Sequence, residues 1–554
     1  MVASSCPIAA VRWWWTGSVR RVITARVDPA ELSDAWSAAL TRLRDSDAVR
    51  RIWERDHTVF CDDPAEVVDR LGWLRAPADA QEQWPHWALV ADEIVDGASD
   101  RELGTVTDVV VLGMGGSSLF PEVLASAFEA GDGFPSITVL DSTHPSAVDR
   151  VTSALDPEHT LVVVASKSGS TIETRSHLEH FWARSPIGRR FVAVTDPGSG
   201  LEELAHERGF RAVLHGDPEI GGRFAAMSAF GMVPAALMGL DATTMLDTAE
   251  ETLELLGPDV PVDEHPGAQL GALIAVAARA GRDKLTFHLD ERLGSFGSWI
   301  EQLIAESTGK QGVGILPVLG DGPHAADPEG RLHVLIGETG IDPAVIDGPW
   351  VQLQVEEPED LGAQVVLWEF ATAVAGVVLG INPFDQPDVE SAKREARSLL
   401  GGGGPDDGPD GGAGAPWAAS VAGEASLTDA LAALRPGDAL VIAAFVDPAL
   451  GERLEAARRA LSERAGVAVT LGIGPRFLHS TGQLHKGGAD RHVVVQVLDD
   501  PSADDRSADV AIPGQSFTFG QLLRAQADGD LAALAAADKR AFRVPLADLL
   551  AGLA

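Results

Sequence analysis

The chain of 554 residues contains no tyrosine and only two cysteines, Cys6 and Cys61. The cysteines form neither a CxxC pair nor a cluster with histidine, which argues against a disulfide framework or a structural metal. Basic residues number 43 against 82 acidic ones, and the net charge of −39 disfavours nucleic acid and anionic membranes as partners. No apolar run is expected to reach the ~20 residues that cross a bilayer. These absences predict a soluble protein in a reducing compartment, the cytoplasm.

Short apolar runs alternate with helical patterns from residue 105 onward. Buried strands are predicted over 106–114, 136–141, 160–166 and 189–196, and helices over 118–129 and 146–155. A second block has predicted strands over 284–290 and 351–357 and predicted helices over 293–308 and 361–380. Strands that are apolar throughout and separated by helices are typical of parallel, doubly wound sheets.

The predicted organisation has five parts. Residues 1–104 are an N-terminal extension, irregular at first and helical over 29–56, and residues 105–240 and 241–400 are two doubly wound α/β domains. The Gly-rich stretch 401–416 has the composition of a flexible linker. Residues 417–554 are a smaller C-terminal α/β unit, with predicted strands over 438–446 and 492–499.

The turn Ser166-Lys167-Ser168-Gly169-Ser170-Thr171 lies between a predicted strand and a predicted helix. Free backbone N–H groups and the positive end of a helix dipole favour an anion there, and hydroxyl groups add donors to phosphate oxygens. An ordinary helix N-cap would use the same residue types. The turn is therefore a candidate phosphate site.

Two glycine turns are further candidates for ligand contact. In Gly113-Met114-Gly115-Gly116-Ser117-Ser118, Ser118 occupies the third glycine position of the dinucleotide fingerprint, so a sugar or phosphate fits better than a dinucleotide. In Gly221-Gly222-Arg223-Phe224, Arg223 offers a planar fork of donors. Packing turns are the structural alternative for both.

Three polar segments could supply proton transfer. Glu306 lies at the end of the predicted helix 293–308, where the helix dipole favours its protonated form and suits a general acid or base. Gln386 and Lys393 are seven residues apart and would share one helix face. His479 and His485 lie in a polar segment, 479–488, which we expect to be a loop. An exposed helix end, an exposed lysine and a structural turn are the alternatives.

These segments, in this order, resemble the motifs of glucose-6-phosphate isomerases. SKSGST resembles the family's phosphate-binding loop, and GMGGSS, GGRF, AESTGK and NPFDQPDVESAK resemble its other motifs across about 105–398. The resemblance implies two sugar-isomerase (SIS-like) domains, a homodimer and a reaction without cofactor or metal. It implies interconversion of glucose 6-phosphate and fructose 6-phosphate through a cis-enediolate, a step of glycolysis and gluconeogenesis.

The same resemblance implies a role for each matched residue. Glu306 moves the proton between C2 and C1, Arg223 stabilises the enediolate oxygens, and Lys393 helps to open the ring. Glu173 orients a histidine. The remaining substrate-binding residues it implies are Gly116, Ser117, Ser166, Lys167, Ser168, Thr171 and Gln386.

The family's histidine, often supplied by a neighbouring subunit, has no clear counterpart before Lys393. Only His324 and His333 fall in the expected interval, in a segment rich in Gly, Pro and Asp. The C-terminal unit carries TGQLHKGG and resembles the extension of the isomerase half of bacterial transaldolase–isomerase fusion proteins. We therefore expect His485 or His479 to supply the missing group.

Two other functions fit parts of the pattern. An isomerase of mannose 6-phosphate or an amino sugar phosphate would share the same motifs. A non-catalytic sugar-phosphate sensor would need the phosphate turns but not Glu306, Gln386 and Lys393 together.

Overall fold

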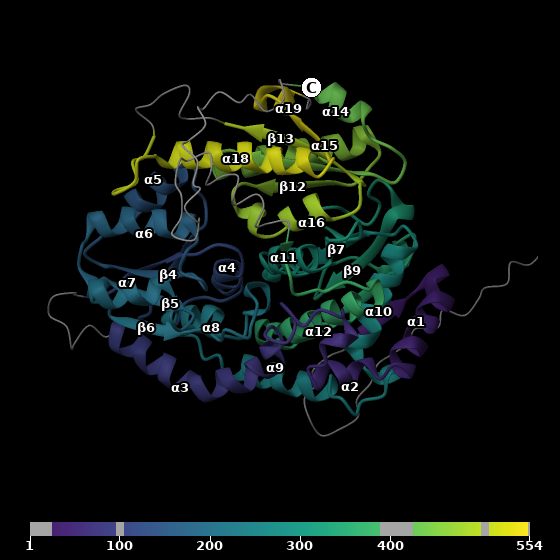
Figure 1. Ribbon diagram of the computed structural model, residues 1–554, viewed down its shortest axis with the longest axis horizontal. Coiled ribbons are helices and arrows are strands. Elements are labelled where there is room, and N and C mark those ends of the chain that lie inside the picture. Colours follow the sequence, from purple (N-terminus) through teal and green to yellow (C-terminus); the bar gives the residue numbers. More distant parts are fainter. Residues whose placement is uncertain (1–24, 96–104, 388–424, 500–508, 552–554) are drawn as a thin grey trace, which may run out of the picture.

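The computed structural model describes residues 25–95, 105–387, 425–499 and 509–551. The described residues form three α/β units, each built on its own sheet (Figure 1). The α/β class with mainly parallel sheets agrees with the sequence prediction. The third unit, green to yellow in Figure 1, lies across the top of the other two.

The first unit is a parallel sheet with the order β3-β2-β4-β5-β6. Its strands are β2 (Asp108–Leu112), β3 (Ser136–Leu140), β4 (Thr160–Ala165), β5 (Phe191–Thr195) and β6 (Ala212–His215). Its helices are α4 (Leu119–Ala127), α5 (Pro145–Ala154), α6 (Ile172–Arg184), α7 (Gly200–Arg208) and α8 (Ala229–Leu237). Strand β4 is buried at every position, as expected for a strand covered on both faces.

The second unit has the strand order β1-β10-β9-β7-β8, in which only β1 is antiparallel. Its strands are β1 (Ala25–Asp28), β7 (Lys284–Leu289), β8 (Leu316–Val318), β9 (Arg331–Ile336) and β10 (Trp350–Leu353). Its helices are α9 (Thr243–Leu255), α10 (Pro266–Arg279), α11 (Phe296–Thr308) and α12 (Leu361–Leu379). Strand β1 comes from the N-terminal segment, so that segment is part of the second sheet.

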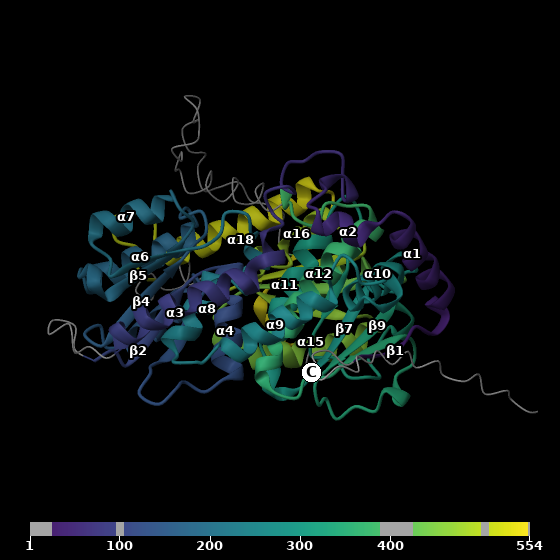
Figure 2. The same ribbon diagram turned by 90° about the horizontal axis from the view of Figure 1, so that it is seen from below.

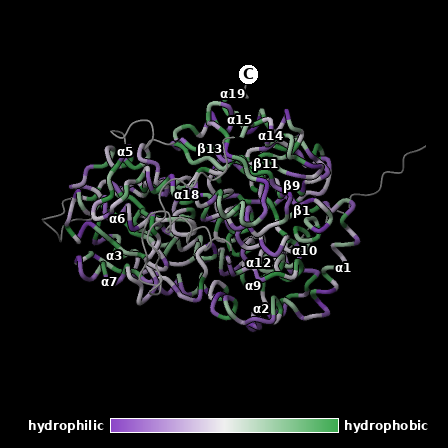
Figure 3. The backbone as a smooth tube through the Cα atoms, turned by 45° about the horizontal axis from the view of Figure 1, so that its top comes forward, coloured by the Kyte–Doolittle hydropathy of each residue, from purple (hydrophilic) through white to green (hydrophobic). Residues whose placement is uncertain are grey.

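The single helix predicted over 29–56 is two helices, α1 (Ser33–Asp45) and α2 (Ala48–Trp53). Asp47 between them has a φ of 52°, a left-handed conformation that interrupts an α-helix. Along α1, hydrophilic and hydrophobic residues alternate (Figure 3), since only one face is buried. The longer helix α3 (Ala76–Val95) packs against α8 and α9.

One segment corrects the expectation that no apolar run could cross a bilayer. Residues Pro358–Leu379, which include α12, are long and apolar enough by length and composition. However, 89% of the most apolar stretch is buried inside the protein. Helix α12 packs against α9, α10 and α11, so it is a core helix of the second unit.

The third unit is a parallel sheet with the order β12-β11-β13-β14. Its strands are β11 (Ala439–Phe445), β12 (Val469–Ile473), β13 (His492–Leu498) and β14 (Arg540–Arg543). Its helices are α14 (Leu427–Ala432), α15 (Gly451–Ala465), α16 (Gly482–Gly487), α18 (Phe519–Ala536) and α19 (Leu546–Ala551), and the 3-10 helix η13 spans Arg476–His479. The segment expected to be a polar loop is therefore mostly helical.

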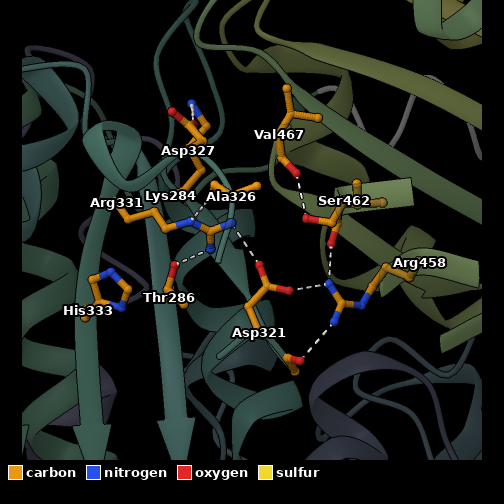
Figure 4. Close-up of polar contacts among 12 residues, drawn as sticks. Lys284, Thr286, Asp321, Ala326, Asp327, Arg331, His333, Arg458, Ser462 and Val467 are labelled. Atoms are coloured by element: carbon orange, nitrogen blue, oxygen red, sulfur yellow. Dashed lines mark hydrogen bonds and ion pairs between the residues drawn. The ribbon is translucent and has the colours of Figure 1, made fainter. Parts of the chain in front are cut away.

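Two kinds of contact hold the third unit against the others. Phe519 and Leu522 of α18 pack on Val148 of α5, and Figures 1 and 2 show α18 reaching over the first unit. At the second unit, the buried Asp321 pairs with both Arg331 of β9 and Arg458 of α15 (Figure 4). The third unit is thus docked on its own chain.

Candidate active site

The two glycine- and serine-rich turns of the first unit lie next to each other. One follows β2 and the other follows β4, and these strands are neighbours in the sheet. The chain continues from β2 to β3 on one side and from β4 to β5 on the other, so the strand order reverses between them. Ligands of open α/β sheets bind at such a point, beyond the carboxyl ends of the strands.

The GGRF turn lies directly against the first glycine turn. A Cβ on Gly116 would come within 1.9 Å of the carbonyl oxygen of Gly222, so a larger residue cannot occupy this position unless the backbone moves. Gly115 has a φ of 55°, and a Cβ there would meet the Gln302 amide at 2.8 Å. These glycines allow the first unit, Arg223 and α11 to approach one another.

A cavity of about 390 Å³ opens between these turns, α11 and η13. It is lined by most of the residues predicted from sequence: Gly116, Ser117, Lys167, Ser168, Thr171, Arg223, Glu306, Gln386 and His479. Ser166 and Glu173 do not line the cavity, but each contacts a residue that does. The hydroxyl of Ser166 is 3.2 Å from that of Thr171.

Lys167 in the candidate phosphate turn already has partners within the protein. Its ammonium group pairs with the Asp196 carboxylate and donates to the backbone oxygen of Asp217 at 3.0 Å. Burial raises the pKa of Asp196, against the opposing effect of Lys167. Ser168 beside it is exposed, so its hydroxyl is accessible to a ligand.

Glu306 is 5% exposed and is held by two donors. Its Oε1 is 3.3 Å from Nη1 of Arg223, and its Oε2 accepts a hydrogen bond from Nε2 of Gln302 at 3.1 Å. These two contacts fix the direction in which the Glu306 carboxylate points. Glu306 is therefore held in place at the cavity wall.

Arg223 is fixed from several sides. Its Nε donates to the hydroxyl of Ser307 at 2.8 Å, and its Nη2 donates to the backbone oxygens of Pro383 and Asp385 at 2.7 and 3.0 Å. Burial lowers its pKa from the usual value, and Glu306 partly restores it. The guanidinium thus links the GGRF turn, the Glu306 helix and the segment that carries Gln386.

Lys310 also belongs to the AESTGK segment but has a structural contact. Its Nζ donates to the backbone oxygen and to Oδ1 of Asp385, both at 2.6 Å. Burial and the nearby Arg223 lower its pKa to about 8.

Of the two C-terminal histidines, only His479 lines the cavity. Its Nε2 is 2.9 Å from Oε1 of Glu173, although 306 residues separate them in the chain. Its backbone oxygen accepts from Nε2 of Gln302 at 2.8 Å, so η13 is tied to α11. The structure thus brings together Glu173 and a histidine of the C-terminal unit, the pair that the resemblance predicts.

His485 lies elsewhere, in α16, and is 3% exposed. Its ring packs near Phe477 and His492, and burial lowers its pKa well below the usual range. A neutral imidazole buried among aromatic rings is a packing residue, which explains why the structure does not support His485 as the missing group.

The two histidines of the expected interval do not reach the cavity either. His324 is exposed, and His333 lies within β9 rather than in a loop. His333 stacks on His288 with a nitrogen-to-nitrogen distance of 3.0 Å, and burial lowers its pKa to about 3.

Some lining residues were not predicted from sequence: Glu66, Arg70, Asp196 and Gln302. Gln302 precedes Glu306 by four residues, and this i, i+4 spacing on one helix face is a signal that could have identified it. Arg70 lies outside every recognised motif. Lys393 falls outside the described residues. Among the described residues, no three His, Cys, Asp or Glu side chains form a group that could hold a metal ion.

Comparison with known proteins finds relatives of this chain by sequence. A family model described as phosphoglucose isomerase matches residues 87–316. A glucose-6-phosphate isomerase from Citrifermentans bemidjiense is 30% identical over 398 residues, which cover 59% of this chain and 74% of that protein. Another from Gloeothece citriformis is 29% identical over 351 residues, which cover 53% of this chain and 66% of that protein.

Solved structures share the fold. A hypothetical protein from Thermus thermophilus aligns with a TM-score of 0.56 at 26% identity, covering 68% of this chain and all of that one. A glucose-6-phosphate isomerase from Chlamydia trachomatis aligns with a TM-score of 0.56 at 20% identity, covering 68% of this chain and 88% of that one.

The fold, the cavity and these matches define a sugar-phosphate isomerase. The chain belongs to the glucose-6-phosphate isomerase family.

Proposed function

We propose that this cavity interconverts glucose 6-phosphate and fructose 6-phosphate through a cis-enediolate, with Glu306 and His479 as its proton-transfer groups. One observation carries the proposal: both side chains line the cavity that the phosphate turn borders, and each is held by a buried partner. Sequence matches to glucose-6-phosphate isomerases support the choice of substrate.

The phosphate group is proposed to bind at residues 166–171. This turn offers the hydroxyls of Ser166, Ser168 and Thr171 and the N-terminus of α6, a helix of 13 residues. Because Lys167 already pairs with Asp196, hydroxyl and backbone donors are expected to provide much of the binding. Gly116 and Ser117 then border the sugar.

Glu306 is proposed to take the proton from C2 and return it to C1. In a cis-enediolate the two carbons present the same face, so one carboxylate can serve both. As the C2–H bond breaks, negative charge develops on the adjacent oxygen, and the fixed guanidinium of Arg223 can stabilise it. Gln302 keeps the Glu306 carboxylate in place throughout.

His479 is proposed to open the sugar ring. An ionised carboxylate only accepts hydrogen bonds, so the contact with Glu173 places the proton of His479 on Nε2. Nδ1 is then the nitrogen that exchanges a proton with the sugar. The C1–O5 bond breaks, O5 gains a proton, and the O1 hydroxyl loses one to form the carbonyl.

Two further residues are proposed to act at this site. Lys393 is proposed to assist ring opening, and Gln386 to contact the sugar from the cavity wall. A homodimer is expected from the family, but His479 comes from the same chain, so the described site needs no second copy. Scarce cysteine supports a cytoplasmic location.

The test is a coupled assay on purified protein. Fructose 6-phosphate is supplied with EDTA, and the glucose 6-phosphate formed is followed through a dehydrogenase. We expect sustained turnover that EDTA does not reduce. Binding of fructose 6-phosphate without turnover would instead favour a sensor, and turnover only with an amino sugar phosphate would change the substrate.

A further inference from the structure

Helix α18 contributes one side chain to the pair formed by Glu173 and His479. Gln526 is 4% exposed, and its Nε2 donates to Oε1 of Glu173 at 2.6 Å. Nε2 of His479 lies 2.9 Å from the same oxygen. We propose that Gln526 is a positioning residue for ring opening, which acts on His479 through Glu173.

The orientation of the Gln526 amide is set by a second contact. The hydroxyl of Thr143, which is fully buried between β3 and α5, donates to Oε1 of Gln526 at 2.8 Å. With its oxygen occupied as an acceptor, the amide must direct its NH₂ group at Glu173. The chain of contacts therefore runs from Thr143 through Gln526 and Glu173 to His479.

Two donors on one carboxylate oxygen have a defined chemical effect. They favour the ionised form of Glu173 and restrict its rotation. An ionised, fixed Glu173 holds the proton of His479 on Nε2 and leaves Nδ1 for the sugar. His177, one turn further along α6, is neutral near pH 7 because burial lowers its pKa to about 4, so it adds no competing charge.

The third unit contributes to this chain of contacts through two side chains. His479 and Gln526 come from separate elements of that unit, η13 and α18, whereas Glu173 and Thr143 belong to the first unit. The third unit thus supplies both the histidine and a donor that orients the carboxylate behind it. Correct docking of α18 becomes a requirement for ring opening.

This inference rests on the proposed role of His479, and two reactions of one substrate separate the two claims. Exchange between the α and β anomers of glucose 6-phosphate needs only ring opening and closure. Isomerisation needs Glu306 as well. In a Glu306→Gln background, anomer exchange measured by NMR therefore reports ring opening alone.

The experiment compares Gln526→Leu, His479→Asn and the double variant in that background. We expect Gln526→Leu to slow catalysed anomer exchange by roughly 10–100-fold, in line with other groups that orient a catalytic side chain. We expect KM of the same variant, measured with Glu306 intact, to stay within about two-fold. Adding Gln526→Leu to His479→Asn should cause no further loss, because residues that act as one unit are not additive.

Arg150→Gln is the matched control. Arg150 of α5 pairs with Asp447 of the third unit at 2.9 Å, but this contact is partly exposed and lies outside the cavity lining. It should leave anomer exchange unchanged. Unaltered exchange in Gln526→Leu, or equal losses with and without His479, would overturn the role of Gln526. Unaltered exchange in His479→Asn, or none in the Glu306→Gln background itself, would overturn the proposed ring-opening step instead.

Discussion

Replacing Asp321 with asparagine should loosen the third unit from the second. Oδ2 of Asp321 lies 2.8 Å from Nη2 of Arg331, and its Oδ1 lies 2.6 Å from Nη1 of Arg458 (Figure 4). The exposed fractions of the three side chains are 5%, 0% and 1%. Asparagine keeps the shape of the side chain but removes the negative charge that both guanidinium groups share.

The size of the effect follows from what each arginine keeps. Arg458 retains Glu455 at 2.8 Å, whereas Arg331 keeps close contacts to the neutral oxygens of Ala326 and Thr286. Breaking a buried ion pair costs about 3–5 kcal/mol. Because one arginine keeps a carboxylate, we expect the lower end, about 3 kcal/mol. For a unit of this size that is a fall in Tm of roughly 6–12 °C.

Thermal unfolding followed by calorimetry and by residual isomerase activity measures this change. Activity should fall in the same temperature range, because the third unit carries His479. Asp263→Asn is the control: its ion pair with Arg44 has exposed fractions of 63% and 52%, and such a pair contributes less than about 1 kcal/mol. If Asp321→Asn and the control unfold at the same temperature, the buried network does not hold the third unit in place.

Three further variants test the site and its surroundings. Glu306→Gln should lower kcat by roughly 10³-fold with the fold intact, since it removes the proposed proton acceptor but keeps the shape of the side chain, and kcat near wild type would reject the assignment. Arg223→Lys loses the planar fork of donors that reaches Ser307 and the backbone. Steady-state kinetics should show a fall in kcat of about 10²-fold with a smaller change in KM. An effect on KM alone would mean that Arg223 only binds the substrate. Burial raises the pKa of Glu301 to about 7. The protonated side chain therefore contributes its full stability below the pKa of the unfolded chain, and this stability is lost as the pH rises through about 7. Glu301→Gln should therefore reduce the decline in Tm between ~pH 5 and ~pH 8, and an identical decline in both proteins would show that Glu301 does not cause it.

The sequence was most informative where local pattern and burial agree. The runs 106–114, 160–166 and 189–196 contain β2, β4 and β5, because strands covered on both faces are apolar throughout. The turns that follow β2 and β4 could be recognised as ligand-binding, since their glycines and hydroxyls serve that purpose in any such fold.

Elements whose burial depends on distant partners were missed. Strand β9 begins at Arg331 and contains His333, polar residues that would not suggest a buried strand. Arg331 is accommodated only because Asp321 neutralises it. The break at Asp47 gave only a weak local signal, since aspartate adopts a positive φ less readily than glycine.

The choice between His479 and His485 also depended on tertiary structure. Both histidines lie in one polar segment of the sequence. Only the docking of the third unit brings His479 of η13 to Glu173, whereas His485 is buried in α16. Gln526 could not be found from sequence for the same reason, because 353 residues separate it from Glu173.

The most direct test of the account compares His479→Asn with His485→Asn in the coupled assay with fructose 6-phosphate. We predict a loss in kcat of about 10²-fold or more for His479→Asn, as for other proton-transfer groups. We predict that folded His485→Asn keeps kcat near wild type. The reverse order, or full activity in both variants, would contradict the claim that the third unit supplies the proton-transfer histidine through His479.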